Sequence, residues 1–326
     1  MTIQEILSVI QKAAIATSAG GQLTTEQAKQ FIDLVVGQSD FLKAIQTVQM
    51  TSNTYQLNTI DIASRIMRSA AEGQDPGFIQ GVTITPRTLV YKESILPYDV
   101  TFSFLEENIE GENAESKINE MFAKAFGNEI LDLAVNGDET LAEAITDTTP
   151  ADGLDDVTGL SQNDHTFLRQ NDGWLQIAKN DSTVHDVILP SSITSWKTEF
   201  KRILQVLPNK WKGNPGELAF FVAPDVETEY RDELGERSTA LGDVYLTQDR
   251  SAQYQGIPVK AIPFWPGGSN PVVMLTKPKN LAVGIGRNIR VGRQIQERKR
   301  IIEYTITAKT DFQYVLGDLI VLGKKA

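Results

Sequence analysis

The stretch that decides the fold is SFLEENIEGENAESKINEMFAKAFGNEILDLAVNGD, from Ser103 to Asp138. The acids at its entrance favour a helix N-terminus, where the helix dipole stabilises negative charge. Apolar residues then recur at steps of three, four and five, which predicts one apolar stripe: Ile118, Phe122, Ala125, Ile130, Leu133 and Ala134. The Asn136-Gly137-Asp138 sequence predicts the helix end, with a left-handed cap. We therefore expect a helix of about 22 residues, roughly 33 Å long, which is long for a globular protein.

Length and composition describe a globular protein of about two domains. The chain has 326 residues, of which 41% are hydrophobic and 22% are charged. It has no cysteine, which excludes disulfides and thiolate catalysis. No run of about 18 apolar residues occurs, and the first residues lack the apolar stretch of a signal peptide. We therefore expect neither a transmembrane helix nor a membrane partner.

Charge is distributed unevenly along the chain. The net charge of −11 argues against a protein that grips nucleic acid across a broad face. Residues 99–164 carry 17 acids against two lysines, whereas residues 287–309 carry seven bases against two acids. Opposite charges on separate segments favour complementary surfaces, within one subunit or between subunits. Independently solvated faces are an equal alternative.

Two segments before the long helix predict the strands of a hairpin. Apolar residues alternate with charged ones in residues 55–68, and residues 82–93 predict the returning strand, which Pro86 interrupts. A lone hairpin is marginal in water, its edges invite pairing, and nothing nearby in the sequence covers it. We expect a neighbouring subunit to cover this hairpin. The alternative is that it packs on the later sheet of its own chain.

The remaining segments complete an α+β fold class. Residues 1–54 predict short helices joined at Gly20-Gly21, which suit an arm as well as a domain. Residues 151–277 alternate helical and strand signals, and therefore predict an α/β region with its own core. The chain beyond residue 277 is rich in strand signals.

No segment predicts a catalytic, cofactor-binding or metal site. The glycine-rich segment Gly284–Gly292 lacks the Lys-Ser/Thr ending of a phosphate loop and runs into a strand. The acids of residues 152–156 lack the spacing of an EF-hand. The two histidines, His165 and His185, have no metal-ligand companion motif. We therefore predict a protein that is not an enzyme and that needs no cofactor.

The order of these parts resembles the major capsid proteins of tailed bacteriophages, which have the Hong Kong 97-type fold. The resemblance covers nearly the whole chain, and none of its segments is a strict signature. It rests on ILPYDVTFSFLEENI before the long helix and AVNGD at its end, on FFVAPDVETEYRDEL and YQGIPVKAIPFWP in the α/β region, and on IGRNIRVGRQIQERKRIIEYTITAKTDFQYVLGDLIVL.

The resemblance implies a division of the chain into four parts. They are an N-terminal arm (1–54), an extended loop or E-loop (55–98), a peripheral domain with the long spine helix (99–150 and 278–312), and an axial α/β domain (151–277 and 313–326).

The resemblance also implies a function. Such proteins are structural components of the virion in tailed phages of the Caudoviricetes type, and they self-assemble as pentamers and hexamers into an icosahedral shell around double-stranded DNA. The implied partners are the protein itself, packaged DNA contacted non-specifically, a portal, decoration proteins, and a separate scaffolding protein or none, since the arm is too short for a scaffolding segment. The implied location is the virion capsid, assembled in the cytoplasm of the host bacterium.

We predict that the extended loop contacts the next spine helix in the shell. Exposed ion pairs contribute about 0–1 kcal/mol each, so apolar burial should dominate while charges set the register. The predicted inter-subunit residues are Ile60, Ile62, Arg65, Ile66, Arg68, Val82, Ile84 and Arg87 on the loop, and Glu106, Glu107, Glu110 and Glu112 before the helix. Some relatives join subunits through a lysine on this loop. No lysine lies between Thr54 and Tyr91, so we predict no such crosslink.

Two alternatives stay open. One is an encapsulin-like nanocompartment, which shares this fold and encloses a cargo enzyme. The other is a cytoplasmic α/β enzyme with an unrecognised site, which predicts a small oligomer and a cleft lined for a ligand.

Overall fold

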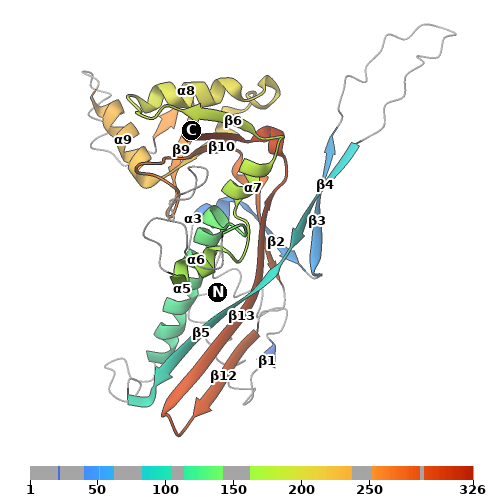
Figure 1. Ribbon diagram of the computed structural model, residues 1–326, viewed down its shortest axis with the longest axis vertical. Coiled ribbons are helices and arrows are strands. Elements are labelled where there is room, and N and C mark those ends of the chain that lie inside the picture. The colour runs from blue at the N-terminus through green and yellow to red at the C-terminus, as the bar shows by residue number, and fades with distance from the viewer. Residues whose placement is uncertain are drawn as a thin grey trace, which may run out of the picture.

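The computed structural model describes residues 21–22, 40–50, 52–61, 83–103, 114–141, 162–236, 252–286 and 290–325. These residues form two sheets with helices packed against them, and a two-stranded finger that projects from the body (Figure 1). In this described part of the chain, no helix is both long and apolar enough to cross a membrane. Most of the predicted N-terminal arm lies outside the described residues.

The first sheet is built around one long strand, β13 (Ile301–Tyr314). One edge of β13 pairs with β12 (Arg290–Gln296) and then with β11 (Leu281–Gly286), while the other edge pairs with β5 (Lys92–Thr101). Two further strands complete the sheet: β1 (Gly21–Gln22) beside β12, and β2 (Gln46–Met50) beside β11. The sheet therefore runs most of the height of the molecule (Figure 1).

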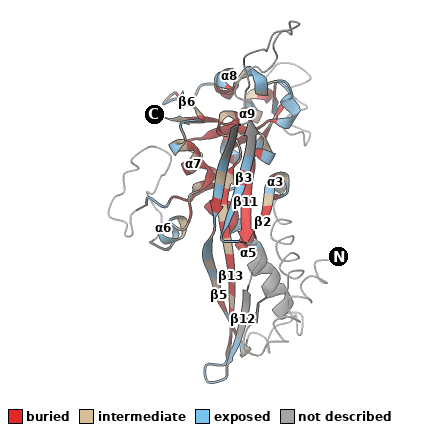
Figure 2. Cartoon of the chain, turned by 90° about the vertical axis from the view of Figure 1, so that its right-hand side faces the viewer, coloured by how far each residue is buried: buried red, intermediate tan, exposed pale blue. Residues whose placement is uncertain are grey.

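One face of this sheet is buried and the other is partly exposed. Every second side chain of β13 is buried, as expected for a strand with one face against a core. On the buried face, Tyr304 stacks on Tyr98 of β5 with ring centroids 4.9 Å apart. The burial follows the length of β13 (Figure 2). The core thus continues from this sheet into the helices beside it.

The predicted long helix is α5 (Ala114–Asn136), which packs against β13 and α7 (Trp174–Asn180). It has 23 residues and ends where the sequence predicted, and Ile130, Leu133 and Ala134 of the predicted stripe are buried. The predicted left-handed cap is wrong, because Gly137 is not among the described residues with positive φ. Glycine is needed there for a close approach instead: a Cβ at Gly137 would lie 2.2 Å from the carbonyl oxygen of Asn171.

The second sheet lies at the other end of the molecule and is covered on both faces. Phe220 and Phe221 are neighbours in one strand and therefore point to opposite faces. Phe220 packs against Phe200 at 4.7 Å between centroids, and Phe221 packs against Phe41 at 5.2 Å. The strands follow in the order β6 (His185–Leu189), β14 (Val321–Lys325), β10 (Val273–Thr276), β7 (Ala219–Val222), β9 (Ile257–Ala261) and β8 (Gln253–Tyr254).

Helices cover the second sheet. α8 (Trp196–Val206) packs on β6 and β14, and α9 (Pro224–Gly235) packs on β9. The other described helices are α3 (Asp40–Ala44), α6 (Gln162–Leu168) and the 3₁₀ turns η2 (Asn209–Trp211), η3 (Pro215–Glu217), η4 (Pro278–Asn280) and η5 (Gly317–Leu319).

The predicted hairpin is present as β3 (Thr54–Asp61) paired antiparallel with β4 (Thr83–Val90). We call these two strands the finger, and their residues 54–58 and 86–90 the finger root. Residues 62–82, which join the strands, lie outside the described residues. Beyond Tyr91 the chain leaves the finger and joins the first sheet as β5, with Lys92 opposite Thr310. The paired part of the finger thus ends earlier than the predicted extended loop, and the four domain boundaries stay a prediction.

The expectation that the chain does not cover its own hairpin is wrong for the finger root. Leu57 and Leu89 are buried in a small second core with Val48, Met50 and Ala282 from β2 and β11. The apolar surface under the finger root is formed by the parallel pair of strands β2 and β11. β2 directly precedes the finger in sequence, whereas β11 lies far along the chain. The alternative of packing on the later sheet of the same chain is therefore correct for the root.

Candidate inter-subunit site at the finger root

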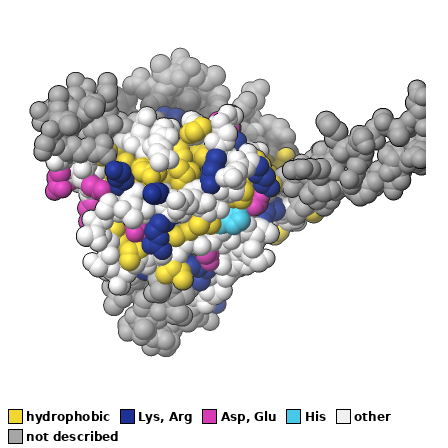
Figure 3. Space-filling model, turned by 90° about the horizontal axis from the view of Figure 1, so that it is seen from above, with side chains coloured by type: hydrophobic (Ala, Val, Ile, Leu, Met, Phe, Trp, Pro, Cys, Tyr) yellow, Lys and Arg dark blue, Asp and Glu magenta, His cyan; other side chains and the backbone are white. Residues whose placement is uncertain are grey.

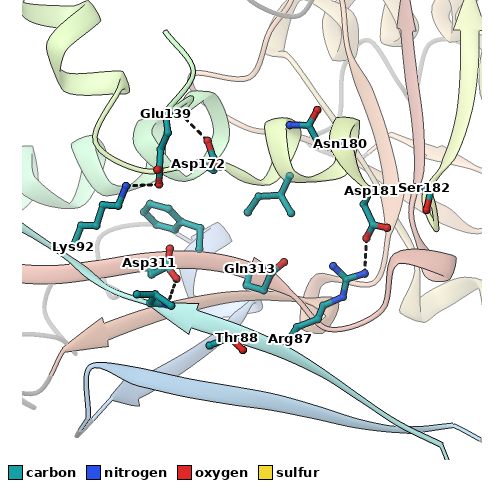
Figure 4. A pocket seen from close by; sticks show the side chains of 13 residues that line it. Arg87, Thr88, Lys92, Glu139, Asp172, Asn180, Asp181, Ser182, Asp311 and Gln313 are labelled. Atoms are coloured by element: carbon teal, nitrogen blue, oxygen red, sulfur yellow. Dashed lines mark hydrogen bonds and ion pairs between the residues drawn. The ribbon is translucent and has the colours of Figure 1, made fainter. Parts of the chain in front are cut away.

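The finger root borders an open cavity of about 710 Å³ between β4, β5, β13 and α7 (Figure 4). Charged side chains from segments far apart in sequence line it, and dashed lines in Figure 4 mark their pairing. Sequence reasoning assigned a role to one of these lining residues, Arg87. The cavity lies where the finger meets the first sheet and α7, so its contacts determine how the finger is held.

Arg87 of β4 reaches across this junction to Asp181, which follows α7. The two side chains form an ion pair with 19% and 15% of their surfaces exposed. The guanidinium also lies over the ring of Tyr314, 4.5 Å from its centroid, where a cation is attracted by the π-system. The Tyr314 hydroxyl donates a hydrogen bond of 2.7 Å to the Asp181 carboxylate. Three distant segments thus meet at one carboxylate.

The surroundings of Asp181 keep it ionised. Burial opposes the charge, but hydrogen bonds from the Thr183 backbone and hydroxyl, from Tyr314 and from Arg87 hold the pKa of Asp181 well below its ordinary value. Burial and the neighbouring Asp181 raise the pKa of the Tyr314 hydroxyl. The cluster is tightly packed, since a Cβ at Gly317 would lie 1.9 Å from the Thr183 hydroxyl. Glycine is therefore required at this point.

A second contact fixes the end of β4. The backbone N–H of Val90 donates a 2.6 Å hydrogen bond to the Asp311 carboxylate of β13. Burial is the main reason that the pKa of Asp311 is raised to about 6; the backbone N–H groups of Val90 and Phe312 oppose this rise, and the charges of Glu139 and Lys92 have smaller effects of opposite sign. Lys92 pairs with Glu139 at 2.5 Å, and the Glu139 N–H donates to Asp172. Burial likewise raises the pKa of Asp172.

The charged side chains at this junction pair with one another and link separate segments of the chain. Arg87 and Lys92 each have a carboxylate partner. Among the described residues, no group of three or more His, Cys, Asp or Glu side chains could hold a metal ion. His185 contacts Asp318 at 3.1 Å. Gly284 and Gly286 lie in β11, and Gly292 lies in β12.

The structure places few of the predicted inter-subunit residues. Ile60 and Ile84 are opposite each other in the finger. Arg87 pairs within its own chain, so its side chain is already engaged before any subunit contact. The role of all these residues between subunits stays a prediction. The others lie outside the described residues: Ile62, Arg65, Ile66, Arg68, Val82, Glu106, Glu107, Glu110 and Glu112.

Sequence reasoning missed the partners of Arg87 at the finger root. Asp181 is 94 positions from Arg87, and Tyr314 is 133 positions from Asp181. Asp181 lies in a polar segment that is typical of a solvent-exposed loop. Tyr314 fits the alternation of apolar and polar residues that is typical of a strand. Neither position carries a local pattern that could have signalled the contact.

Comparisons with known proteins agree with this architecture. No protein-family model matches the chain. The putative prophage capsid protein YqbE of Bacillus subtilis (strain 168) is 28% identical over 333 residues, which cover 98% of this chain and 97% of that protein. A solved chain of the satellite phage P4 procapsid, which includes a size determination protein, superimposes with a TM-score of 0.63 at 14% identity. The alignment covers 100% of this chain and 98% of that one.

The chain has the Hong Kong 97-type capsid fold. The predicted α+β class and the predicted family resemblance are therefore confirmed. Two further structures share this capsid fold. The capsid of a native GTA particle gives a TM-score of 0.61 at 11% identity, covering 89% of this chain and 90% of that one. The SrpI encapsulin of Synechococcus elongatus PCC 7942 gives 0.52 at 11% identity, covering 87% of each chain.

Proposed function

We propose that the chain is the major capsid protein of a tailed phage or prophage. Its copies assemble as pentamers and hexamers into an icosahedral shell that encloses double-stranded DNA. The observation that carries this proposal is the end-to-end relationship to a putative prophage capsid protein, which spans 98% of this chain and 97% of the relative. An alignment of that extent matches the whole architecture and not one shared domain.

The finger gives this proposal a physical basis. Among the described strands, β3 and β4 pair only with each other. A two-stranded ribbon is marginal in water, and its open edges are ready to pair. At the root, Tyr55 and Val90 remain 43% and 52% exposed. A finger that leaves its own body in this way gains stability by lying on a neighbouring copy, and repeated contacts of that kind can close into a shell.

Charged faces on the body support contacts of defined orientation. Although the chain is acidic overall, α8 presents the exposed bases Lys197, Lys201 and Arg202. Figure 3 shows the face seen from above, where basic and apolar side chains mix across the middle, with acidic ones at one edge and scattered among them. Complementary charge on two contacting protein surfaces disfavours wrong orientations of the subunits more than it increases their affinity. Such a surface suits a protein whose main partner is itself.

The finer parts of the proposal follow from the capsid role. The protein acts structurally and not as an enzyme, and its location is the virion capsid after assembly in the cytoplasm of the host bacterium. Packaged DNA, a portal, decoration proteins and a separate scaffolding protein, if one is used, are its further partners. The negative net charge favours non-specific DNA contact over tight binding.

A protein nanocompartment is the second candidate, because the SrpI encapsulin shares the fold with a TM-score of 0.52. The value is lower than the 0.63 found for the phage P4 procapsid chain. Particle contents discriminate between the two. A cargo enzyme enclosed in fixed proportion would support the nanocompartment, whereas its absence from particles that fill with DNA in infected cells would support the capsid.

Expression of the full chain, alone and together with any scaffolding protein of the same phage, tests the proposal directly. Sedimentation and negative-stain electron microscopy should show closed particles of uniform size in at least one of the two preparations. A discrete dimer or tetramer with no larger species in both, over a range of salt and protein concentrations, would refute a shell-building function and would favour the enzyme alternative.

A further inference from the structure

We propose that Arg87, Asp181 and Tyr314 form a latch that fixes the direction in which the finger leaves the body, and thereby the angle at which it meets the neighbouring subunit. The inference rests on the proposed function for its consequence in assembly. The latch itself is a property of the single chain. Arg87 is thus a positioning residue within its own subunit, and not one side of an ion pair between subunits.

Two fixed points on one strand define the direction of the finger. Side chains two positions apart on a strand point to the same face, so Arg87 and Leu89 both point towards the body. Leu89 is fully buried in the second core, and Arg87 is held by Asp181. The outward positions Pro86, Thr88 and Val90 are exposed. The two contacts lie about 7 Å apart along β4.

Without Arg87, β4 would be held at its root end by Leu89 in the second core and by the adjacent Val90 N–H on Asp311, and these neighbouring contacts would act as a pivot. Apolar packing is non-directional, so the small core around Leu89 resists withdrawal of the strand more than its rotation. The latch adds direction because the planar guanidinium is held by the Asp181 carboxylate and by the face of the Tyr314 ring. Asp181 is fixed in turn by the Thr183 N–H at 2.9 Å and the Thr183 hydroxyl at 2.7 Å.

A small rotation at the root would matter at the far end of the finger. The strand from the pivot at Leu89 to Thr83 extends about 20 Å, at about 3.3 Å per residue. A rotation of about 10° would displace its end by about 3.5 Å, which is more than half of the ~4.8 Å spacing between paired strands. A displacement of that size is enough to disturb pairing or packing on a neighbour, and it grows with distance from the root.

The test measures the direction of the finger and the outcome of assembly in the same variants. The chain has no cysteine, so two introduced cysteines carry spin labels without interference. Asn58→Cys on the finger and Ser191→Cys on the body are both at exposed positions. Pulsed electron spin resonance on labelled full-length chain, diluted with unlabelled chain, gives the distribution of distances between the two labels.

The variant is Arg87→Gln, and the matched control is Arg231→Gln. Arg231 also pairs with a carboxylate, that of Glu227 at 2.5 Å, but it lies on α9 away from the finger. Arg87→Gln should broaden or shift the distance distribution and give particles that are open or of mixed size. Arg231→Gln should keep the narrow distribution and the uniform particles. Tyr314→Phe keeps the buried ring and removes the hydroxyl that bonds to Asp181, and it should broaden the distribution less.

The outcomes separate the latch from the function on which it rests. If Arg87→Gln keeps both the narrow distribution and the particle size, the latch is refuted. If Arg87→Gln fails to fold, an unchanged distribution in Tyr314→Phe and in Asp181→Asn would refute it. If the unsubstituted chain forms no particles, either alone or with any scaffolding protein of the same phage, the proposed function fails. The label distances in the same chains would then still support or overturn the latch.

Discussion

Asp311→Asn should stabilise the protein at neutral pH and should have no effect near pH 4. Asp311 lies in β13, is largely buried and accepts a hydrogen bond from the Val90 N–H at the finger root. Glu139 from the loop after α5 and Lys92 from β5 are the charged groups that act on it. Its pKa is raised by burial from 3.8 to about 6. Asparagine keeps a carbonyl acceptor for Val90 and removes the charge.

The sign and size of the effect follow from proton linkage. Between about pH 4 and pH 6 the folded chain holds a proton on Asp311 that the unfolded chain has lost, so the free energy of unfolding falls as the pH rises through this window. A difference of about two pKa units corresponds to about 3 kcal/mol, at 1.36 kcal/mol per unit. Above the window, the wild-type protein carries this full penalty and Asp311→Asn does not.

Urea unfolding of unassembled full-length chain from about pH 4 to pH 8 measures the difference. The curves of the two proteins should meet near pH 4 and separate by about 3 kcal/mol at pH 8. Asp318→Asn is the control of opposite sign. Burial raises the pKa of Asp318, but bonds from Lys210, Trp211 and His185 lower it overall, so its removal should destabilise at neutral pH. A constant difference between Asp311→Asn and wild type across the whole range would refute the reasoning.

Three other outcomes are expected. Leu89→Ala opens a cavity in the second core and should destabilise the finger root by about 2–5 kcal/mol. Hydrogen exchange should become faster in β3 and β4 and stay unchanged in β7 and β10. An equal loss of protection in both pairs of strands would contradict a separate core. Arg68→Glu should reduce the fraction of closed particles in micrographs and leave the melting temperature of the subunit unchanged. A lowered melting temperature of the isolated subunit would contradict this prediction. Particles dissolved in hot detergent should run as one band of single chains, because no lysine lies between Thr54 and Tyr91, and a ladder of joined subunits would show the prediction to be wrong.

Local patterns in the sequence predicted the elements but not how they are joined. The end of α5 at Asn136 was predicted because the apolar stripe and the Asn-Gly pair are visible within one segment. The reason for Gly137 was not visible, since the atom that excludes a side chain belongs to Asn171. The strands of the finger were predicted from alternation, a property of neighbouring residues.

The finger root was misjudged because its supports come from several segments, most of them remote: Met50 directly precedes the finger, whereas Ala282 and Asp181 lie far along the chain. Leu57 and Leu89 pack on Met50 and Ala282, and the partner of Arg87 follows α7. A pattern search that reads one segment at a time cannot pair such residues. From the sequence, the side chain of Arg87 in a hairpin could equally well point to solvent or to another subunit. Arg87 is the one predicted contact residue whose side chain the structure describes, and it forms an ion pair inside its own chain.

Cryo-electron microscopy of particles assembled from the full chain tests the central claim most directly. The account predicts closed shells of pentamers and hexamers in which residues 62–82 of each subunit lie across an adjacent copy, while Arg87 stays paired with Asp181 of its own chain. A reconstruction in which those residues fold back onto the parent subunit, or a preparation with no assembly beyond a dimer, would contradict it.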